Sequence, residues 1–491
     1  PDLAGVGVAF KLICALEGDE SCQETMEYYG DLLALGTIAD VVPLQGENRA
    51  LVKWGPPVLQ TTQNLGLMAL IQASGLGERQ LTSESVAFGL APRVNAAGRL
   101  GYAQRALELL LTEDEEEAEV LAQELNGYNQ ARKGMEQKIF EEIRQRLQAK
   151  PALARQRVVV LSGEGWHQGV IGIVASKVVE LVGRPCVLLS VEGEQARGSC
   201  RSVEGFSIVQ ALTACESHLL RYGGHSQAGG LTLQTTEIPA FCQALQEYAA
   251  DQFDTMPTST LTLQGSLQAK DVTMEQVKAL NRLEPFGCGN PQPIFCLPGC
   301  RIEGIYSIGE GKHLRLRLGQ NGAYFYGVYF GMAANRFPYS EGDTVDLAVQ
   351  FSVQVYQGQE QLSIQIVDIH PEHLSQTALW EGREVMDRLY RREPLLPQQK
   401  EQCVPDRQDL VKVYKYLRSR GGLFPGGAEQ LWPHLAPLSY AKVCNSLLIL
   451  QEQKLLAPGK TGTGYRLLAV EAKRDLEKSP LLSRLRQWPV V

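Results

Sequence analysis

The chain has 491 residues, of which 44% are hydrophobic and 21% charged, and this composition excludes wholesale disorder. No run of about 18 apolar residues occurs, so the sequence contains no membrane span. The eleven cysteines are scattered without a CxxC pair. This pattern is typical of reduced thiols in a cytoplasmic protein and argues against a zinc site.

The net charge of −8 is unevenly distributed along the chain. Residues 371–491 carry 19 basic and 13 acidic residues, a local charge of +6, whereas residues 1–370 carry 28 and 42, a local charge of −14. Because an acidic protein can contain a locally basic groove, the balance neither favours nor excludes a nucleic-acid partner.

The N-terminal region is predicted to be helical over residues 1–17, 24–36, 64–75 and 83–91, with the pair Pro56-Pro57 breaking the chain within it. A longer helix is predicted over residues 113–148. Thr112 is its candidate N-cap, and the acidic residues that follow suit the positive end of a helix. This helix would be about 54 Å long, so we interpret it as a connector between two domains, with a coiled-coil seam as the alternative.

Beyond residue 150, strands and helices alternate, which predicts an α/β domain. Apolar runs at 158–161 and 186–191 indicate buried strands. Two further strands and three helices complete the pattern, with the strands at 196–202 and 231–234 and the helices at 170–182, 207–221 and 238–252.

Residues 258–370 are predicted to be mostly strands with glycine turns and one helix, at 274–283, a pattern that favours an OB-fold barrel. The strands are expected at 261–267, 300–309, 313–319, 323–331, 343–356 and 361–369. Residues 371–407 are predicted to hold a helix and a linker. Three helices and the hairpin LLAPGKTGTGYRLL (455–468) follow, in the order of a winged helix, which would bind DNA, bind a protein or only stabilise the chain.

Two motifs of the N-terminal region bear polar residues among small ones. ALGTIADVVPL (34–44) contains Asp40, either a metal ligand, since carboxylates suit Mg²⁺ and Mn²⁺, or a helix cap. APRVNAAGRL (91–100) contains Arg93, Asn95 and Arg99, which suit phosphate recognition. The alternative for this motif is a turn between helices with surface arginines.

Two further motifs lie in the α/β region. RGSCRSVEG (197–205) places Ser199 and Arg201 on one face of a strand, where they could bind an anion. YGGHSQAGG (222–230) has four glycines around His225, and such a bare backbone allows close approach of a nucleic acid, or simply makes a tight loop. We expect Gly223 and Gly224 to end the preceding helix.

The predicted barrel carries the Gly/Pro-rich turn LEPFGCGNP (283–291) and a basic strand with His313, Arg315 and Arg317. Aromatic residues crowd the next strand, at Tyr324, Tyr326, Tyr329 and Phe330. Because bases stack on aromatic rings and phosphates pair with cations, this face suits single-stranded nucleic acid. An ordinary half-exposed barrel face is the alternative.

These five motifs, together and in this order, resemble those of the bacterial RecJ family in the DHH phosphoesterase superfamily, over about residues 1–370. The resemblance implies a multidomain α/β fold with a partial DHH catalytic domain, a connecting helix, a DHH-associated nucleic-acid-binding domain, an OB-fold and a winged-helix-like extension. The corresponding domains are 1–112, 113–150, 151–256, 257–370 and 371–491.

The resemblance also implies an activity, two-metal hydrolysis of single-stranded DNA from the 5′ end in repair and recombination, with Mn²⁺ or Mg²⁺ as cofactors. Asp40 would be the catalytic metal ligand, and Arg315, Arg317 and Tyr326 would contact DNA on the OB-fold. Single-stranded DNA is the implied partner, with a single-strand-binding protein and a recombination helicase as candidate protein partners, in the cytoplasm. The implied substrate-binding residues are Asn95, Arg99, Ser199, Arg201, Ser202, Gly223, Gly224 and His225.

The chain departs from the family in one respect. The Asp-His-His signature is absent, and no two histidines are adjacent. We therefore expect an N-terminally truncated chain that begins at Pro1, past the earlier motifs. Two alternatives stay open, a catalytically inactive single-strand-binding module and a DHH-family phosphatase of short oligonucleotides or nucleotides.

Overall fold

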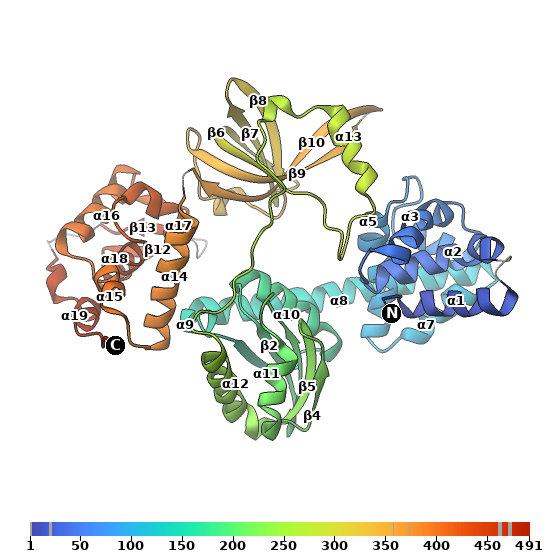
Figure 1. The fold of residues 1–491 in the computed structure, drawn as a ribbon, viewed down its shortest axis with the longest axis horizontal. Coiled ribbons are helices and arrows are strands. Elements are labelled where there is room, and N and C mark those ends of the chain that lie inside the picture. Colours follow the sequence, from blue (N-terminus) through green and yellow to red (C-terminus); the bar gives the residue numbers. More distant parts are fainter. Residues whose placement is uncertain (1, 19–21, 357, 373, 460–463, 470–473) are drawn as a thin grey trace. The chain divides into compact units, whose positions relative to one another are not determined.

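The computed structural model describes the whole chain except residues 1, 19–21, 357, 373, 460–463 and 470–473. It divides into two compact units (Figure 1). The first comprises Pro1–Arg146, Arg157–Ser259 and Leu280–Gln292, and the second Leu147–Gln156, Thr260–Ala279 and Pro293–Val491. The mixed α/β architecture predicted from the sequence is confirmed. No helix in the described part of the chain has the length and apolar character of a membrane span.

The N-terminal region is all helical. Helical segments occur in all four predicted ranges, whereas the helices at Gly46–Gln60, Ala91–Arg99 and Ala103–Leu111 were not predicted. The prediction that Pro56-Pro57 break the chain is wrong, because both lie inside a helix, α3. Pro56 is buried, and α3 packs against α2 so closely that a Cβ on Gly55 would lie 2.0 Å from the Cβ of Ala34. Tertiary packing thus outweighs the lost hydrogen bonds. The helices are α1 (Gly5–Glu17), α2 (Cys22–Ala39), α3 (Gly46–Gln60), α4 (Leu65–Ala73), α5 (Ser83–Ser85), α6 (Ala91–Arg99) and α7 (Ala103–Leu111), with a π-helical turn at Val86–Leu90.

The long helix α8 spans Glu115–Ala149. Its first turn is capped by Asp114, whose Oδ1 accepts the N–H of Glu117 at 2.8 Å. The prediction that Thr112 is the N-cap is wrong. Thr112 is instead the C-cap of α7, a helix that was not predicted from the sequence. The first half of α8 packs against the N-terminal helices through Leu121 and Leu125. Further along, Glu142 accepts a hydrogen bond from the Trp166 indole at 3.0 Å, so α8 connects the helical region to the α/β region.

The α/β region is a five-stranded sheet of order β1-β2-β3-β5-β4, with only β1 and β2 parallel. The predicted helix over 207–221 is wrong at its end, because Arg221–Gly224 form the edge strand β4. Gly223 and Gly224 pair there with Gly230 and Gly229 instead of ending a helix. The strands are β1 (Val159–Glu164), β2 (Cys186–Glu192), β3 (Gln195–Arg201), β4 and β5 (Ala228–Gln234), and the main helices are α10 (Gln168–Val182), α11 (Ile208–Ala214) and α12 (Ile238–Gln252).

The second unit contains a closed five-stranded barrel of order β10-β8-β7-β6-β9, as an OB-fold requires. The predicted strand at 261–267 is wrong, because the segment makes only an isolated bridge, Ser266 with Cys296, and a few backbone hydrogen bonds beside it. Its alternating residues Leu261 and Leu263 are exposed, so their spacing does not reflect a core. The elements are α13 (Met274–Leu280), β6 (Phe295–Ile308), β7 (His313–Gln320), β8 (Ala323–Tyr329), β9 (Thr344–Tyr356) and β10 (Gln359–Pro371).

The C-terminal region has winged-helix topology, with a small sheet of order β11-β13-β12. Part of the predicted hairpin turn, residues 460–463, lies outside the described residues. The central helix of the C-terminal region, α18, is buried along most of its length and packs against α14, α15, α16, α17 and α19. Its elements are α14 (Gln376–Arg391), α15 (Pro397–Cys403), α16 (Arg407–Ser419), β11 (Leu423–Phe424), α17 (Ala428–Leu431), α18 (Tyr440–Glu452), β12 (Leu456–Pro458), β13 (Tyr465–Leu467) and α19 (Pro480–Arg486).

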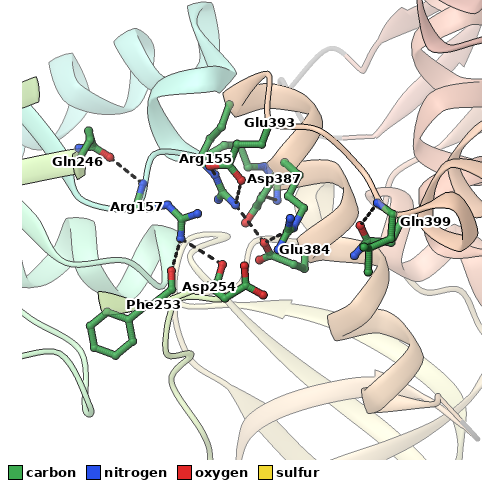
Figure 2. Close-up of polar contacts among 12 residues, drawn as sticks. Arg155, Arg157, Gln246, Phe253, Asp254, Glu384, Asp387, Glu393 and Gln399 are labelled. Atoms are coloured by element: carbon green, nitrogen blue, oxygen red, sulfur yellow. Dashed lines mark hydrogen bonds and ion pairs between the residues drawn. The ribbon is translucent and has the colours of Figure 1, made fainter. Parts of the chain in front are cut away.

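Two arginines anchor the chain on either side of Gln156 (Figure 2). Arg155 belongs to the second unit and forms an ion pair of 2.9 Å with Asp387 of α14, whose side chain is only 2% exposed. Arg157 belongs to the first unit and donates to the carbonyl oxygens of Phe253 at 2.6 Å and Asp254 at 3.2 Å. Each arginine thus fixes the chain within its own unit.

Candidate nucleic-acid interface

Asp40 lies directly after the C-terminal residue of α2 and is exposed. A carboxylate at the negative end of a helix is unfavourable unless a cation is near. Within the described part of the chain, no hydrogen-bond or ion-pair partner of this carboxylate is seen. Its position therefore suits a metal ligand. However, no group of three or more His, Cys, Asp or Glu side chains among the described residues could hold a metal ion, so Asp40 alone does not make a metal site.

The second motif lies on α6 rather than on a turn, and it meets the Asp40 turn directly. Asn95 donates from its side-chain nitrogen to the carbonyl oxygen of Ala39 at 3.2 Å. Arg93 is occupied elsewhere, since its Nε donates to Asn126 Oδ1 of α8 at 3.1 Å. Asn95 thus supports the residue before Asp40, and Arg93 supports the packing of α6 on α8.

Arg99 is the last residue of α6 and lies against the first turn of α10. A Cβ on Gly169 would lie 2.1 Å from the Arg99 carbonyl oxygen. The pKa of Arg99 is lowered by partial burial and by the positive charges of Arg132 and Arg201. Arg132 of α8 and Arg201 of β3 therefore lie close enough to Arg99 to repel its charge, although Glu136, the ion-pair partner of Arg132, acts in the opposite direction.

Ser199 and Arg201 lie on the face of β3 that α10 covers. A Cβ on Gly172 would lie 2.9 Å from Ser199 Oγ and 3.4 Å from the Arg201 guanidinium, so glycine is needed for this packing. The Arg201 guanidinium donates to the Cys200 carbonyl oxygen at 2.8 Å. The serine and the arginine are thus presented together at the first turns of α10, as the sequence predicted.

The glycine-rich motif lies beside these residues in the same sheet. Ser199 pairs with Gly230, and Gly230 pairs with Gly223 across the sheet. Arg201 pairs with Ala228, whose carbonyl oxygen accepts the His225 N–H at 2.8 Å. His225 is exposed. Its backbone lies two strand spacings, or about 10 Å, from the backbone of Arg201. The structure therefore brings these residues together along a strip of bare backbone.

Ser202 takes a different position from the other predicted site residues. Its hydroxyl donates to the carbonyl oxygen of Phe206 at 2.6 Å, and its N–H donates to the carbonyl oxygen of Gln227 at 2.9 Å. The hydroxyl is thus engaged in holding the turn after β3.

Sequence analysis missed a polar cluster on α8. Asn129, Arg132 and Glu136 are buried, and Arg132 donates to Asn129 Oδ1 at 3.1 Å and to Glu136. Lys177 of α10 forms an ion pair with Glu136. The sequence contains a sign of this cluster. The three polar residues lie on the same helix face as Leu125 and Ile139, at positions where a buried helix face would ordinarily carry apolar side chains.

On the barrel, Arg315 and Arg317 alternate with buried leucines on β7 and point outward. Arg315 lies over the ring of Tyr326 at 4.1 Å, and Arg317 over the ring of Tyr324 at 5.2 Å. Both tyrosines are exposed. Tyr329 differs, because it is only half-exposed, and burial raises the pKa of its hydroxyl group.

Two family models match the chain. The model described as DHHA1 domain matches residues 155–251. The model described as RecJ OB domain matches residues 263–368. These ranges contain the glycine-rich strip and the barrel described above.

Curated proteins from several bacteria are similar to the chain. It is 35% identical over 373 residues to the single-stranded-DNA-specific exonuclease RecJ of Bacillus subtilis, covering 75% of the chain and 46% of that protein. It is 32% identical over 391 residues to the Salmonella typhimurium protein of the same name, covering 75% of the chain and 67% of that protein.

Crystal structures of RecJ from Thermus thermophilus in complex with Mg²⁺ and with Mn²⁺ are also similar, both with a TM-score of 0.61. Their sequence identities are 35% and 37%, over 71% of this chain and 53% and 50% of those chains. The chain thus spans about half the length of the Bacillus and Thermus proteins.

Proposed function

Because the chain belongs to the RecJ family, we propose that it is the DNA-binding part of a single-stranded-DNA-specific 5′→3′ exonuclease acting in repair and recombination. The observation that carries this proposal is the strip of bare backbone between His225 and the pair Ser199–Arg201. A DNA backbone can approach such a strip closely, since Gly223, Gly224, Gly229 and Gly230 carry no Cβ atoms.

The residues around the strip fit a DNA strand near its 5′ end. Arg99, Arg132 and Arg201 concentrate positive charge, and phosphate oxygens accept charge-assisted hydrogen bonds from guanidinium groups. We assign Asn95, Ser202, Gly223 and Gly224 to the surrounding wall, with Asn95 and Ser202 acting through the backbone that they hold.

The barrel supplies a second surface for single-stranded DNA. Arg315 and Arg317 would pair with phosphates, and Tyr326 and Tyr324 would stack on unpaired bases. A second binding surface of this kind argues against the phosphatase alternative, because short substrates do not need it.

Asp40 is the residue that we assign to the metal ions, Mn²⁺ or Mg²⁺. Two such ions supply an activated water and stabilise the leaving oxygen in phosphodiester hydrolysis. Asp40 would provide one ligand, and the other ligands would have to come from outside the described residues. On this proposal the chain 1–491 binds DNA without cleaving it.

The finer assignments are part of the same proposal. The domains are 1–112, 113–150, 151–256, 257–370 and 371–491, and the protein is cytoplasmic. A single-strand-binding protein and a recombination helicase are the proposed protein partners. The C-terminal region is the candidate surface for them, because its central helix α18 is too covered to enter a DNA groove.

The test is binding of the 491-residue chain to fluorescent oligonucleotides of matched length, single and double stranded, measured by anisotropy. Two stacked bases at about 1–3 kcal/mol each predict a preference for single strands of roughly 30-fold or more. Three or four phosphate contacts predict a log–log salt slope of about −2 to −3. Equal affinity for both forms with a flat salt response would refute the proposal.

A further inference from the structure

The Gly/Pro-rich turn LEPFGCGNP (283–291), which the proposed function leaves without a role, packs against the segment that follows Asp40. We call these residues the clasp loop. The carbonyl oxygen of Cys288 accepts the N–H of Leu44 at 2.7 Å, and that of Gly289 accepts the Gln45 side chain at 3.1 Å. Arg49 donates to the carbonyl oxygen of Leu283 at 2.8 Å. Three hydrogen bonds thus fix the loop to residues 44–49.

The clasp loop is itself shaped for this contact. Asn290 donates from its side-chain nitrogen to the carbonyl oxygens of Leu283 at 2.9 Å and Pro285 at 2.8 Å, which closes the loop. A Cβ on Gly287 would lie 2.7 Å from Leu44 Cδ1. A larger residue at position 287 would therefore force the side chain of the buried Leu44 to move.

The turn just before the contacted residues has a strained backbone. Val41, the residue after Asp40, has a φ of 57°, a left-handed conformation that glycine usually takes at the end of a helix. A β-branched residue is a true outlier there, and strain of this kind persists only where surrounding contacts impose it. Val41 is 70% exposed, so its own side chain does not hold the conformation.

The covalent path of the clasp loop is also informative. Residues 280–292 belong to the first unit, although the chain on both sides of them, 260–279 and 293 onward, belongs to the second. The chain therefore enters the first unit and leaves it again at this loop, next to the Asp40 turn. On the opposite side of the turn, Asn95 binds the Ala39 carbonyl oxygen.

From these contacts we infer that the clasp loop is a positioning element for Asp40, which holds residues 40–44 in a conformation that they do not adopt alone. Asn290 and Gly287 are its positioning residues, acting through Leu44 and Val41. The inference rests on the proposed function in one respect, the role of Asp40 as a metal ligand. The structural coupling can be measured without DNA or metal.

The experiment is hydrogen–deuterium exchange of the 491-residue chain, followed by mass spectrometry of peptides that cover residues 38–48. Gly287→Val should displace the loop, and Asn290→Ala should open it. Each should accelerate exchange of these amides roughly fivefold or more, since the Leu44 N–H loses its acceptor. A peptide covering β1 should keep its wild-type rate. Gly265→Val is the matched control, because no atom lies within 4 Å of its Cβ position.

A third variant separates positioning from simple packing. Val41→Asn replaces the strained residue by one that tolerates the left-handed conformation. Combined with Asn290→Ala, it should restore at least half of the lost protection over residues 38–48. Wild-type exchange in both loop variants, or no recovery with Val41→Asn, would overturn the inference. A failure of DNA binding would instead refute the proposed function and leave these exchange rates unchanged.

Discussion

At the scale of single residues, Arg201 is the side chain whose loss should affect DNA binding most directly. It lies between the bare strip and Arg99, and it is partly exposed. A charge-assisted hydrogen bond contributes about 1.5–3 kcal/mol, so Arg201→Ala should weaken single-strand binding roughly 10–150-fold. Anisotropy titration measures this change. Arg79→Ala, an exposed arginine in the first unit, is the control, and equal affinities for both variants would contradict the assignment.

A second residue-scale prediction concerns the pH dependence of the barrel. On β10, the Nε2 atom of His370 lies 2.9 Å from the Oδ2 atom of Asp368. The hydrogen bond to Asp368 raises the pKa of His370 above 6.5, whereas the His370 contact lowers the pKa of Asp368 below 3.8 against the effect of burial. The stability that His370 contributes is full below pH 6.5 and is lost as pH rises through its raised pKa. The stability that Asp368 contributes is present above pH 3.8 and is lost as pH falls through its lowered pKa.

Chemical denaturation of the wild type and His370→Gln from pH 5 to pH 9 tests this expectation. The difference in unfolding free energy between them should be largest near pH 5–6 and shrink toward pH 9. A difference that grows with pH would show that the pair does not act as described.

At the scale of elements, the position of α14 depends on one buried carboxylate. Removing Arg155 takes away an ion-pair partner of the buried Asp387 carboxylate, and breaking a buried pair costs about 3–5 kcal/mol. Because Arg155 is 35% exposed, we expect Arg155→Ala to destabilise the second unit by less, about 1–3 kcal/mol. Thermal denaturation measures this loss. The double variant Arg155→Leu/Asp387→Leu should lose less stability than Arg155→Ala. An equal or greater loss of stability would show that the buried charge of Asp387 is not the cause.

At the scale of the whole molecule, DNA binding and cleavage should separate. Residues 1–491 with Mn²⁺ or Mg²⁺ should release no nucleotides from a labelled single strand, because the described residues lack a complete ligand set. The same preparation should bind that strand. Nucleotide release that disappears in Asp40→Ala would refute this prediction.

The sequence by itself determined the fold class and most of the elements, but not the helices α3, α6 and α7 or the strand β4. Apolar runs reveal buried strands such as β1 and β2, because a fully covered strand has no polar side. Alternation of apolar and polar residues in HLRLRL reveals a half-exposed strand, because one face of such a strand is buried and the other faces solvent. The set of motifs was enough to predict the family. The choice of Ser199, Arg201 and His225 as site residues stays a prediction, made because small residues beside polar ones allow close approach of a ligand.

Tertiary structure decided what local rules could not. Packing against α2 keeps α3 helical through two prolines, and pairing of four glycines converts the end of a predicted helix into β4. The closeness of Arg132 and Arg201 to Arg99 depends on packing that brings α6, α8 and β3 together, which no local pattern shows. The role of the clasp loop likewise depends on contacts between residues more than 230 positions apart in the chain, as with Arg49 and Leu283. Local preference contributes tenths of a kcal/mol per residue, whereas long-range packing contributes several kcal/mol at one site, so packing prevails where they conflict.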